Sequence, residues 1–294
     1  MAVLLGLPGF NRDPSSRCPT ARGSAAARAG HLYLRDGAHI HVDDFALRLI
    51  GIPDPSQLLD GLGQWNTPSS ARVCAYFALR HRFAEDQLQR ALEREVRQVI
   101  LLGAGLDSLA LRRPTLAGEI TLVEVDHPDS QRWKLARLEE LGLRTPSVVY
   151  VPVDFAKESL ELRLAESRVM LDQPTFFAWL GVTQYIDRAA CDATLGLIAG
   201  LPRGSEVVFD FIVKNELLVP SERAFSEAAS AASAIRGEPW LTYFDPTELE
   251  EHLADLGFST IHRLTPQLAA SEFYAGQPVE VTPLEAWQLV SARI

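Results

Sequence analysis

Short apolar runs alternate with amphipathic segments from about residue 80 onward, and this alternation most constrains the fold of the 294-residue chain. Residues 99–102 form a continuous apolar run that ends at glycines. Such a run is typical of a strand buried on both faces, as in a parallel sheet. The preceding segment, residues 83–97, spaces its apolar side chains along one face of a helix. This pairing of a helix with a buried strand predicts an α/β fold.

The alternation continues toward the C-terminus. The segments that start at Asp187 and Asp245 predict helices, because an aspartate favours the N-terminal cap, and residues 130–142 predict another. The further strand candidates are residues 121–126, 147–154, 174–181, 205–212, 259–264 and 285–294. This order predicts a parallel or mixed sheet with helices on both faces.

The composition is that of a globular protein, with 47% hydrophobic and 22% charged residues. The formal net charge is −10 and no Lys/Arg run stands out, so we expect no nucleic-acid partner. Cys18, Cys74 and Cys191 are unpatterned, which predicts no metal site and fits a reducing compartment. Pro8 interrupts the apolar opening, and no stretch reaches the roughly 18 apolar residues of a membrane helix. We therefore expect a cytoplasmic protein with no membrane segment.

Acidic residues follow the predicted strands where a ligand of such a sheet would lie. Gly103 and Gly105 form a turn after the first strand that permits close approach of a ligand. Asp126 ends the second strand, where an acid accepts hydrogen bonds from ribose hydroxyls, and Glu124 on the same face is its rival. A plain strand-to-helix turn and a strand-end cap are the alternatives.

A second acidic position follows the third strand. The carboxylate of Asp154 is suited to accept from an adenine amino group while the ring of Phe155 packs on the base. Ser108 occupies the third glycine position of a dinucleotide turn, which disfavours a nicotinamide-dependent oxidoreductase. S-adenosylmethionine carries no phosphate but needs a cation for its carboxylate, and Arg28 and Arg80 are the candidates. A surface salt bridge is the alternative for each arginine.

Together these stretches resemble the leucine carboxyl methyltransferase family, and more narrowly its bacterial branch of S-adenosylmethionine-dependent O-methyltransferases, which includes polyketide carboxyl methyltransferases. The matching stretches are residues 20–29, 80–88, 99–112, 123–128, 151–155, 179–186 and 237–240. They cover most of the chain in the expected order.

The resemblance implies a class I methyltransferase fold, a Rossmann-like seven-stranded sheet whose last strand is antiparallel. It implies that Arg28 and Arg80 hold the methionine carboxylate of S-adenosylmethionine. By the same resemblance, the other cofactor-binding residues are Gly103, Gly105, Asp126, Asp154 and Phe155. Tyr185 matches a tyrosine near the substrate carboxylate in the eukaryotic relatives. Leu180 stands where those relatives carry a cofactor-contacting Glu, and His81 replaces a Thr, which argues against a protein-phosphatase tail as the substrate.

The acceptor decides which residues the chemistry requires. A carboxylate is already ionised and needs no base, whereas a hydroxyl needs a base within hydrogen-bond reach. The candidate bases are His127, His31 and Asp210, with a structural role as the alternative for each. Tyr185 is a second candidate for a catalytic role, and Tyr185 and Trp179 are candidates for the acceptor pocket, with buried aromatic core as the alternative.

Residues 213–244 are too long for a bare connection and predict a lid that carries Trp240 and Tyr243 toward the acceptor. We expect a helical cap at residues 1–79 and a methyltransferase domain at 80–294. The sequence thus predicts an S-adenosylmethionine-dependent O-methyltransferase for a small molecule, such as a polyketide. A nicotinamide-dependent oxidoreductase and a non-catalytic cofactor-binding protein are the alternatives, and the oligomeric state stays open.

Overall fold

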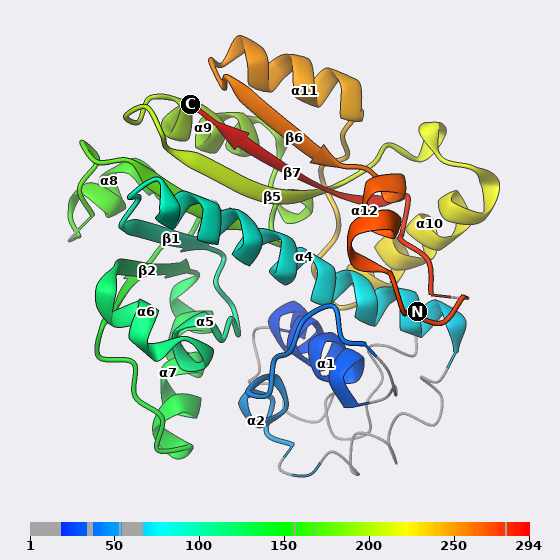
Figure 1. Ribbon diagram of the computed structural model, residues 1–294, viewed down its shortest axis with the longest axis horizontal. Coiled ribbons are helices and arrows are strands. Elements are labelled where there is room, and N and C mark those ends of the chain that lie inside the picture. The colour runs from blue at the N-terminus through cyan, green and yellow to red at the C-terminus, as the bar shows by residue number, and fades with distance from the viewer. Residues whose placement is uncertain are drawn as a thin grey trace.

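A seven-stranded sheet with helices on both faces forms the centre of the computed structural model (Figure 1). The structure describes residues 19–33, 38–52, 54, 67–155, 157–167, 169–279 and 281–294. The opening segment, Cys18 and most of residues 50–70 lie outside these residues. Within them, no helix is both long and apolar enough to cross a bilayer.

The strands and helices follow the predicted alternation. The strands are β1 (Gln98–Leu102), β2 (Thr121–Asp126), β3 (Val148–Pro152), β4 (Thr175–Trp179), β5 (Glu206–Ile212), β6 (Thr260–Leu264) and β7 (Trp287–Arg293). The helices are α1 (Pro19–Tyr33), α2 (Ala46–Leu49), α4 (Pro68–Glu93), α5 (Leu109–Arg112), α6 (Pro114–Glu119), α7 (Pro128–Glu140), α8 (Leu160–Ala165), α9 (Arg188–Ala199), α10 (Pro220–Ile235), α11 (Pro246–Asp255) and α12 (Pro266–Phe273). Two 3-10 turns, η2 (Thr183–Tyr185) and η3 (Asn215–Leu217), complete the set.

The strand order is β3-β2-β1-β4-β5-β7-β6. Strands β1 to β5 are parallel, and β7 lies antiparallel between β5 and β6. The expected seven-stranded sheet with an antiparallel last strand is therefore confirmed. The order reverses between β1 and β4, and open sheets of this kind bind ligands outside the carboxyl ends of the strands at that point.

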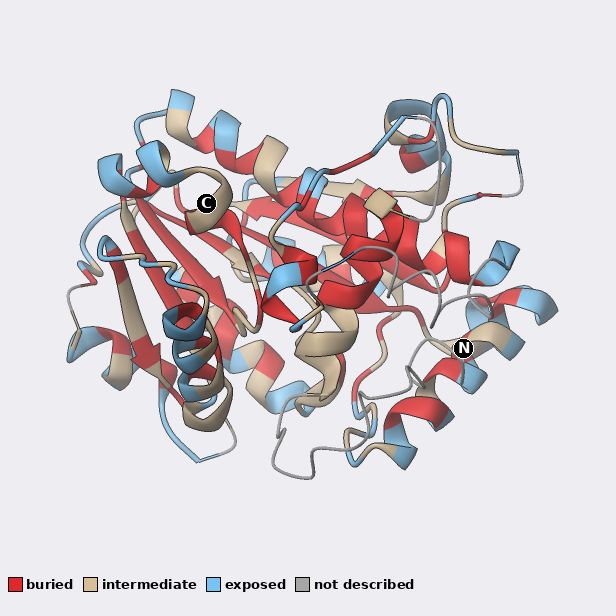
Figure 2. Ribbon diagram, turned by 90° about the horizontal axis from the view of Figure 1, so that it is seen from below, coloured by how far each residue is buried: buried red, intermediate tan, exposed pale blue. Residues whose placement is uncertain are grey.

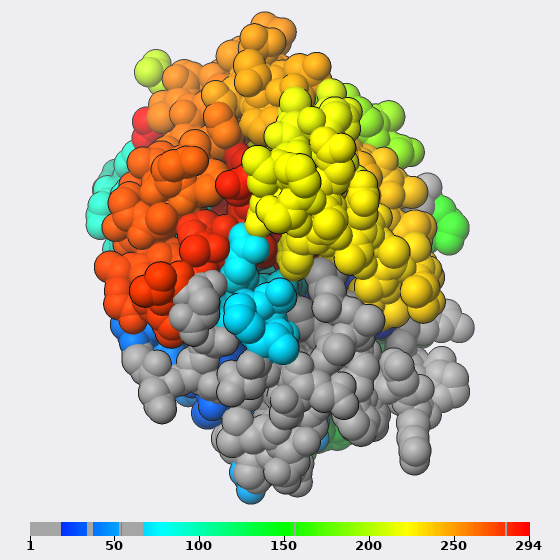
Figure 3. Space-filling model, turned by 90° about the vertical axis from the view of Figure 1, so that its right-hand side faces the viewer, coloured from blue at the N-terminus to red at the C-terminus, as the bar shows by residue number. Residues whose placement is uncertain are grey.

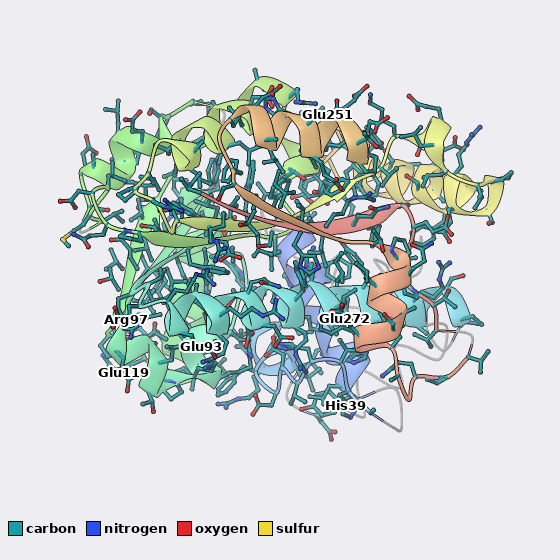
Figure 4. The ribbon with its side chains drawn as sticks, turned by 45° about the horizontal axis from the view of Figure 1, so that its top comes forward. His39, Glu93, Arg97, Glu119, Glu251 and Glu272 are labelled. Atoms are coloured by element: carbon teal, nitrogen blue, oxygen red, sulfur yellow. The ribbon has the colours of Figure 1, made fainter. Side chains whose placement is uncertain are left out.

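Alternate side chains of β1 enter two separate hydrophobic clusters. Val99 and Leu101 pack on the α4 side with Phe83, whereas Ile100 and Leu102 pack on the other face. Every residue of β1 is buried, as the continuous apolar run predicts. Figure 2 shows the buried strands between helices whose outer sides are exposed. The charged side chains of Glu93, Arg97 and Glu119 lie at the surface near the amino end of β1 (Figure 4).

Helix α4 is longer than the segment predicted from residues 83–97. It begins at Pro68, where the Thr67 hydroxyl accepts from the Ser70 amide and proline occupies the first turn. The expected domain boundary between residues 79 and 80 falls inside this helix. Helix α1 packs against α4, and its buried alanines permit that close approach.

Helix α10 and the segment before β7 meet at the start of α4. The Arg72 guanidinium donates to Glu222 of α10 at 2.6 Å and to the Pro283 carbonyl at 2.9 Å. Figure 3 shows α10 beside the first turns of α4 and the C-terminal segment. The Ala/Ser-rich part of residues 213–244 is thus a helix that is tied to the rest of the fold.

Candidate functional site

A cavity of about 710 Å³ lies beyond the carboxyl ends of the parallel strands. Its walls include the turn after β1, the end of β2, the turn after β4, the helices α1 and α4, and the lid residues 236–241. Asp126 and Arg80, which the sequence assigns to opposite ends of one ligand, both line this single cavity. The sheet and its covering segments therefore meet at one site.

The glycine turn after β1 forms the floor of the cavity. Gly103 has a φ of 66° and Gly105 a φ of 49°, a region that side chains other than glycine rarely adopt. A Cβ at Gly103 would lie 2.3 Å from a methyl of Val182, and one at Gly105 would lie 3.1 Å from the Cβ of Ala21. Both glycines are therefore required by conformation and by space.

Asp126 lines the cavity at the end of β2, and its rival does not. Its carboxylate accepts from the Gly105 amide at 2.5 Å and from the His127 amide at 2.7 Å. Burial raises the pKa of Asp126, while these amide hydrogen bonds oppose the rise. Glu124 is only 2% exposed and pairs with the Lys134 ammonium at 2.5 Å, away from the cavity.

Asp154 and Phe155 follow β3 and also line the cavity. The Asp154 carboxylate accepts from the Lys157 ammonium at 2.7 Å. Pro152 ends β3, and so directs the chain out of the sheet at this edge strand. The structure therefore brings the three predicted positions after β1, β2 and β3 to one wall.

The two predicted arginines differ in how many of their guanidinium nitrogens already make a hydrogen bond. The Arg28 guanidinium donates to Asp43, to the Ser24 hydroxyl and to the Leu106 carbonyl, so each of its three nitrogens has a partner. Arg80 donates to Asp210 at 3.2 Å and to the Ser24 hydroxyl at 2.7 Å, but its buried Nε has no partner in the described part of the chain.

Two of the four predicted acceptor residues line the cavity and two do not. Tyr185 and Trp240 line it. Trp179 is wrong as a pocket residue, because side chains alternate along β4 and Ala178 faces the cavity instead. The Trp179 ring is 1% exposed and packs 5.7 Å from the ring of Phe209.

Tyr243 is also wrong as a pocket residue. Its ring lies 6.3 Å from the ring of Trp240, and Tyr243 is not among the residues that line the cavity. Its hydroxyl shares a hydrogen bond of 2.9 Å with the Ser230 hydroxyl of α10. Tyr243 therefore packs against Trp240 and bonds α10 rather than lining the cavity.

The candidate bases have structural partners. The His127 Nδ1 accepts from the Asp129 amide at 3.2 Å and so caps α7. The His31 Nε2 accepts from the Ile40 amide at 2.9 Å, and His31 does not line the cavity. Asp210 lines the cavity but is paired with Arg80. In the described ranges, no group of three or more His, Cys, Asp or Glu side chains is placed to hold a metal.

Sequence reasoning missed several aromatic and charged residues of the cavity. Trp287 of β7, Tyr76 and Phe77 of α4, and Arg236 of the lid all line it. The Trp287 ring lies 5.1 Å from the ring of Tyr76 and 6.0 Å from that of Trp240. A tryptophan in a terminal strand carries no signal for the site, because only the insertion of β7 beside β5 brings it there.

Comparisons with known proteins identify the family. The family model described as leucine carboxyl methyltransferase matches residues 21–199. A Bacillus subtilis (strain 168) protein, YktD, is 29% identical over 216 residues, covering 72% of this chain and 70% of that protein. A Mycolicibacterium paratuberculosis protein is 32% identical over 260 residues, covering 85% of this chain and 96% of that protein. The names of both assign them to the S-adenosyl-L-methionine-dependent methyltransferases.

One solved structure supports the fold. A DUF574 family protein from Streptomyces avermitilis is 17% identical, with a TM-score of 0.55, covering 92% of this chain and 96% of that one. A likeness at this identity concerns the fold alone. The family model matches more than half of the whole chain, which is the stronger finding. By this match the chain belongs to the leucine carboxyl methyltransferase family.

Proposed function

We propose that this S-adenosylmethionine-dependent methyltransferase transfers a methyl group to a carboxylate of a small molecule, such as a polyketide or another specialised metabolite. The observation that carries the proposal is the single cavity that joins Asp126 and Arg80 to an aromatic chamber at Trp240 and Trp287. One ligand at the strand ends and a second in the chamber would lie side by side there.

The residues of the cavity fit the cofactor. An acid for the ribose hydroxyls stands at Asp126, and an acid with an adjacent ring stands at Asp154 and Phe155. Gly103 and Gly105 line the cavity, and a glycine backbone permits close approach of a ligand. The orphaned Nε of Arg80 is a donor for the methionine carboxylate. We assign these residues, with Gly103, to the cofactor.

Arg28 has a different role in this proposal. Its guanidinium joins Asp43 to the Leu106 carbonyl, which follows the glycine turn. Arg28 also lines the cavity, but each of its three nitrogens already makes a hydrogen bond within the protein. We therefore assign Arg28 to holding α1 and the turn together, and Arg80, whose Nε has no partner among the described residues, to the cofactor's carboxylate.

The aromatic chamber favours an acceptor that brings an oxygen to a set of donors. Three donors of lining residues, the indole Nε1 atoms of Trp240 and Trp287 and the Nε of Arg236, are buried and unpartnered among the described residues, and two acceptors, Gln184 Oε1 and Glu238 Oε2, are unpartnered as well. Leaving such a donor unmatched costs about 1–3 kcal/mol, and a carboxylate oxygen would satisfy it. Burial lowers the pKa of Arg236, and the nearby Tyr185 and Glu238 oppose that fall. A hydroxyl acceptor offers fewer acceptor sites and would also need a base.

Positioning and exclusion of water are what this chain contributes to the reaction. When bound, S-adenosylmethionine supplies a methyl group on a sulfonium, which an ionised oxygen attacks in line. A carboxylate needs no base, which agrees with the structural partners of His127 and Asp210. Orientation of two reactants can supply roughly 7–11 kcal/mol of the barrier. Trp240 and Tyr185 are proposed to orient the acceptor.

Helix α1, in the segment before α4, and the lid are proposed to close the cavity together. The Thr20 hydroxyl of α1 donates to the Glu238 carboxylate of the lid at 3.1 Å. Ala21, one residue further, covers Gly105. We therefore propose that the segment before α4 and the lid within residues 213–244 cover a methyltransferase domain to which the whole of α4 belongs, rather than a boundary between residues 79 and 80.

Incubation with methyl-tritiated S-adenosylmethionine and a panel of aromatic and aliphatic carboxylic acids, each with its alcohol analogue, tests the proposal. We expect labelled products from acids only. A methyl ester releases volatile methanol in mild alkali, whereas a methyl ether does not. Alkali-stable product would overturn the carboxylate assignment. Binding of S-adenosylhomocysteine without transfer to any panel member would instead favour the non-catalytic alternative. The nicotinamide alternative does not fit a member of this family.

A further inference from the structure

Asp210 is a buried acid inside β5 that faces the cavity beside Arg80. Its side chain is 5% exposed, and it belongs to the lining. One carboxylate oxygen accepts from the Gly181 amide at 2.5 Å. The other accepts from the Tyr76 hydroxyl at 3.2 Å and from the Arg80 guanidinium at 3.2 Å.

The carboxylate of Asp210 retains room for one more donor. An ionised carboxylate offers about four lone-pair sites. Among the described residues, the three donors from Gly181, Tyr76 and Arg80 leave one of these sites open. A buried charge with an open site is stabilised by a further positive donor from a ligand.

An α-amino acid places a carboxylate and an ammonium on the same carbon. A site for that end therefore needs a cation and an anion next to each other. Arg80 and Asp210 are such a pair, and both line the cavity. Two other acids of the lining have different neighbours: Asp126 bonds the Gly105 and His127 amides, and Asp154 pairs with Lys157. Glu238 lies near a second cation, Arg236, but this second pair belongs to the lid rather than to the strand ends.

We propose that Asp210 accepts a hydrogen bond from the ammonium of the cofactor's methionine end, while Arg80 binds the carboxylate of that end. The inference rests on the proposed placement of the methionine end at Arg80. It assigns Asp210 to cofactor binding in place of the role of a base considered from the sequence. The turn after β4 would then position this acid, since the Gly181 amide donates to the Asp210 carboxylate.

Calorimetric titration with three ligands tests the inference without any turnover. The ligands are S-adenosylhomocysteine, its analogue without the amino group and its analogue without the carboxylate. For the wild-type protein we expect the analogue without the amino group to bind roughly 10- to 100-fold more weakly, as for the loss of one hydrogen bond between charged groups. The affinity of Asp210→Asn for S-adenosylhomocysteine should fall by a similar factor. The analogue without the amino group should bind to this variant as tightly as it binds to wild type.

Glu206→Gln is the matched control. Glu206 is a buried acid on the same strand, bonded to Arg94 and Ser291 at the end away from the cavity. Its replacement should leave the ratio between S-adenosylhomocysteine and the analogue without the amino group unchanged. Tyr76→Phe, which keeps the acid, should preserve that ratio as well.

Three results would overturn the inference. The first is an equal affinity of the wild-type protein for S-adenosylhomocysteine and the analogue without the amino group, which decides the question even if Asp210→Asn does not fold. The second is an equal weakening of both ligands in Asp210→Asn, since that identifies Asp210 as a support for Arg80 alone. The third is an unchanged affinity in that variant. Failure of wild type to bind S-adenosylhomocysteine at all would overturn the proposed function together with the inference.

Discussion

At the scale of single residues, the end of β2 shows how one position separates two acids of the same type. Asp126 and Glu124 lie on the same face of the strand, yet only Asp126 reaches the cavity, because Glu124 is one pair of residues deeper and is held by Lys134. The preference for an acid at the strand end was predictable from the sequence. The choice between the two was not, because Lys134 is placed by α7.

Replacement of Asp126 by Asn should weaken binding of S-adenosylhomocysteine at least 10-fold in calorimetry, because a neutral amide accepts more weakly than a carboxylate from hydroxyl donors. Glu124→Gln serves as the control. It disturbs a buried ion pair and should lower thermal stability while leaving the affinity of the folded protein unchanged. Equal effects of both variants on affinity would contradict the assignment of the ribose to Asp126.

Gly181 is constrained twice, by its backbone and by its neighbour. Its φ is +72°, and a Cβ there would lie 2.7 Å from a guanidinium nitrogen of Arg80. We expect Gly181→Ala to cost about 1–2 kcal/mol of unfolding free energy and to weaken S-adenosylhomocysteine by displacing Arg80. Gly142→Ala is the matched control, because Gly142 has a similar φ of +64° but open space around the Cβ. It should destabilise the protein without changing affinity, and a weaker affinity in this variant would discredit the displacement of Arg80 as the cause.

At the scale of elements, strands and capped helices were predictable to within a few residues. β1 contains the continuous apolar run at residues 99–102, and α11 begins at the predicted cap, where the Asp245 carboxylate accepts from the Thr247 amide at 2.8 Å. The predicted strand 174–181 extends too far, because β4 ends at Trp179 and the chain turns toward the cavity. Its apolar residues continue past that point, so composition alone cannot mark the end.

Removal of the cap in Asp245→Ala should lower the unfolding free energy by about 1 kcal/mol in urea titrations, since it leaves amides of the first turn without a partner. Asp245→Ser should restore most of that loss. Asp255, the last residue of α11, is the comparison on the same helix. Because an acid is unfavourable at the carboxyl end of a helix, Asp255→Ala should be neutral or slightly stabilising. A loss in Asp255→Ala as large as that in Asp245→Ala would show that the cap is not responsible.

At the scale of the whole molecule, a cluster of buried polar side chains joins the segment before α4 to α4 itself. His81 of α4 lies in it with a pKa well below its ordinary value, owing first to burial and then to the charges of Arg28 and Arg80. Burial likewise lowers the pKa of His41 to about 3. Both histidines are therefore neutral in the folded protein, whereas the unfolded chain binds their protons near pH 6.5.

The unfolded state binds more protons than the folded state below that pH, so these histidines make stability fall as the pH falls. From pH 7.5 to 5.5, each histidine should contribute a loss of about 1.4 kcal/mol of unfolding free energy. His81→Asn keeps a donor for the Phe77 carbonyl, which His81 Nδ1 contacts at 2.9 Å. Urea titrations at both pH values should show a decline smaller by that amount in the variant. Parallel declines in variant and wild type would contradict the pKa of His81.

The sequence by itself determined the order of the elements, the two-sided burial of the central strands and the acids at the strand ends, because each depends on residues close together along the chain. Only the tertiary structure decided which aromatic rings form the chamber and which acid stands beside Arg80. Trp287 and Asp210 come from strands that pair antiparallel at the far end of the chain, and Arg80 comes from α4. Contacts of that kind depend on how the strands are ordered in the sheet, which no local pattern of residues specifies.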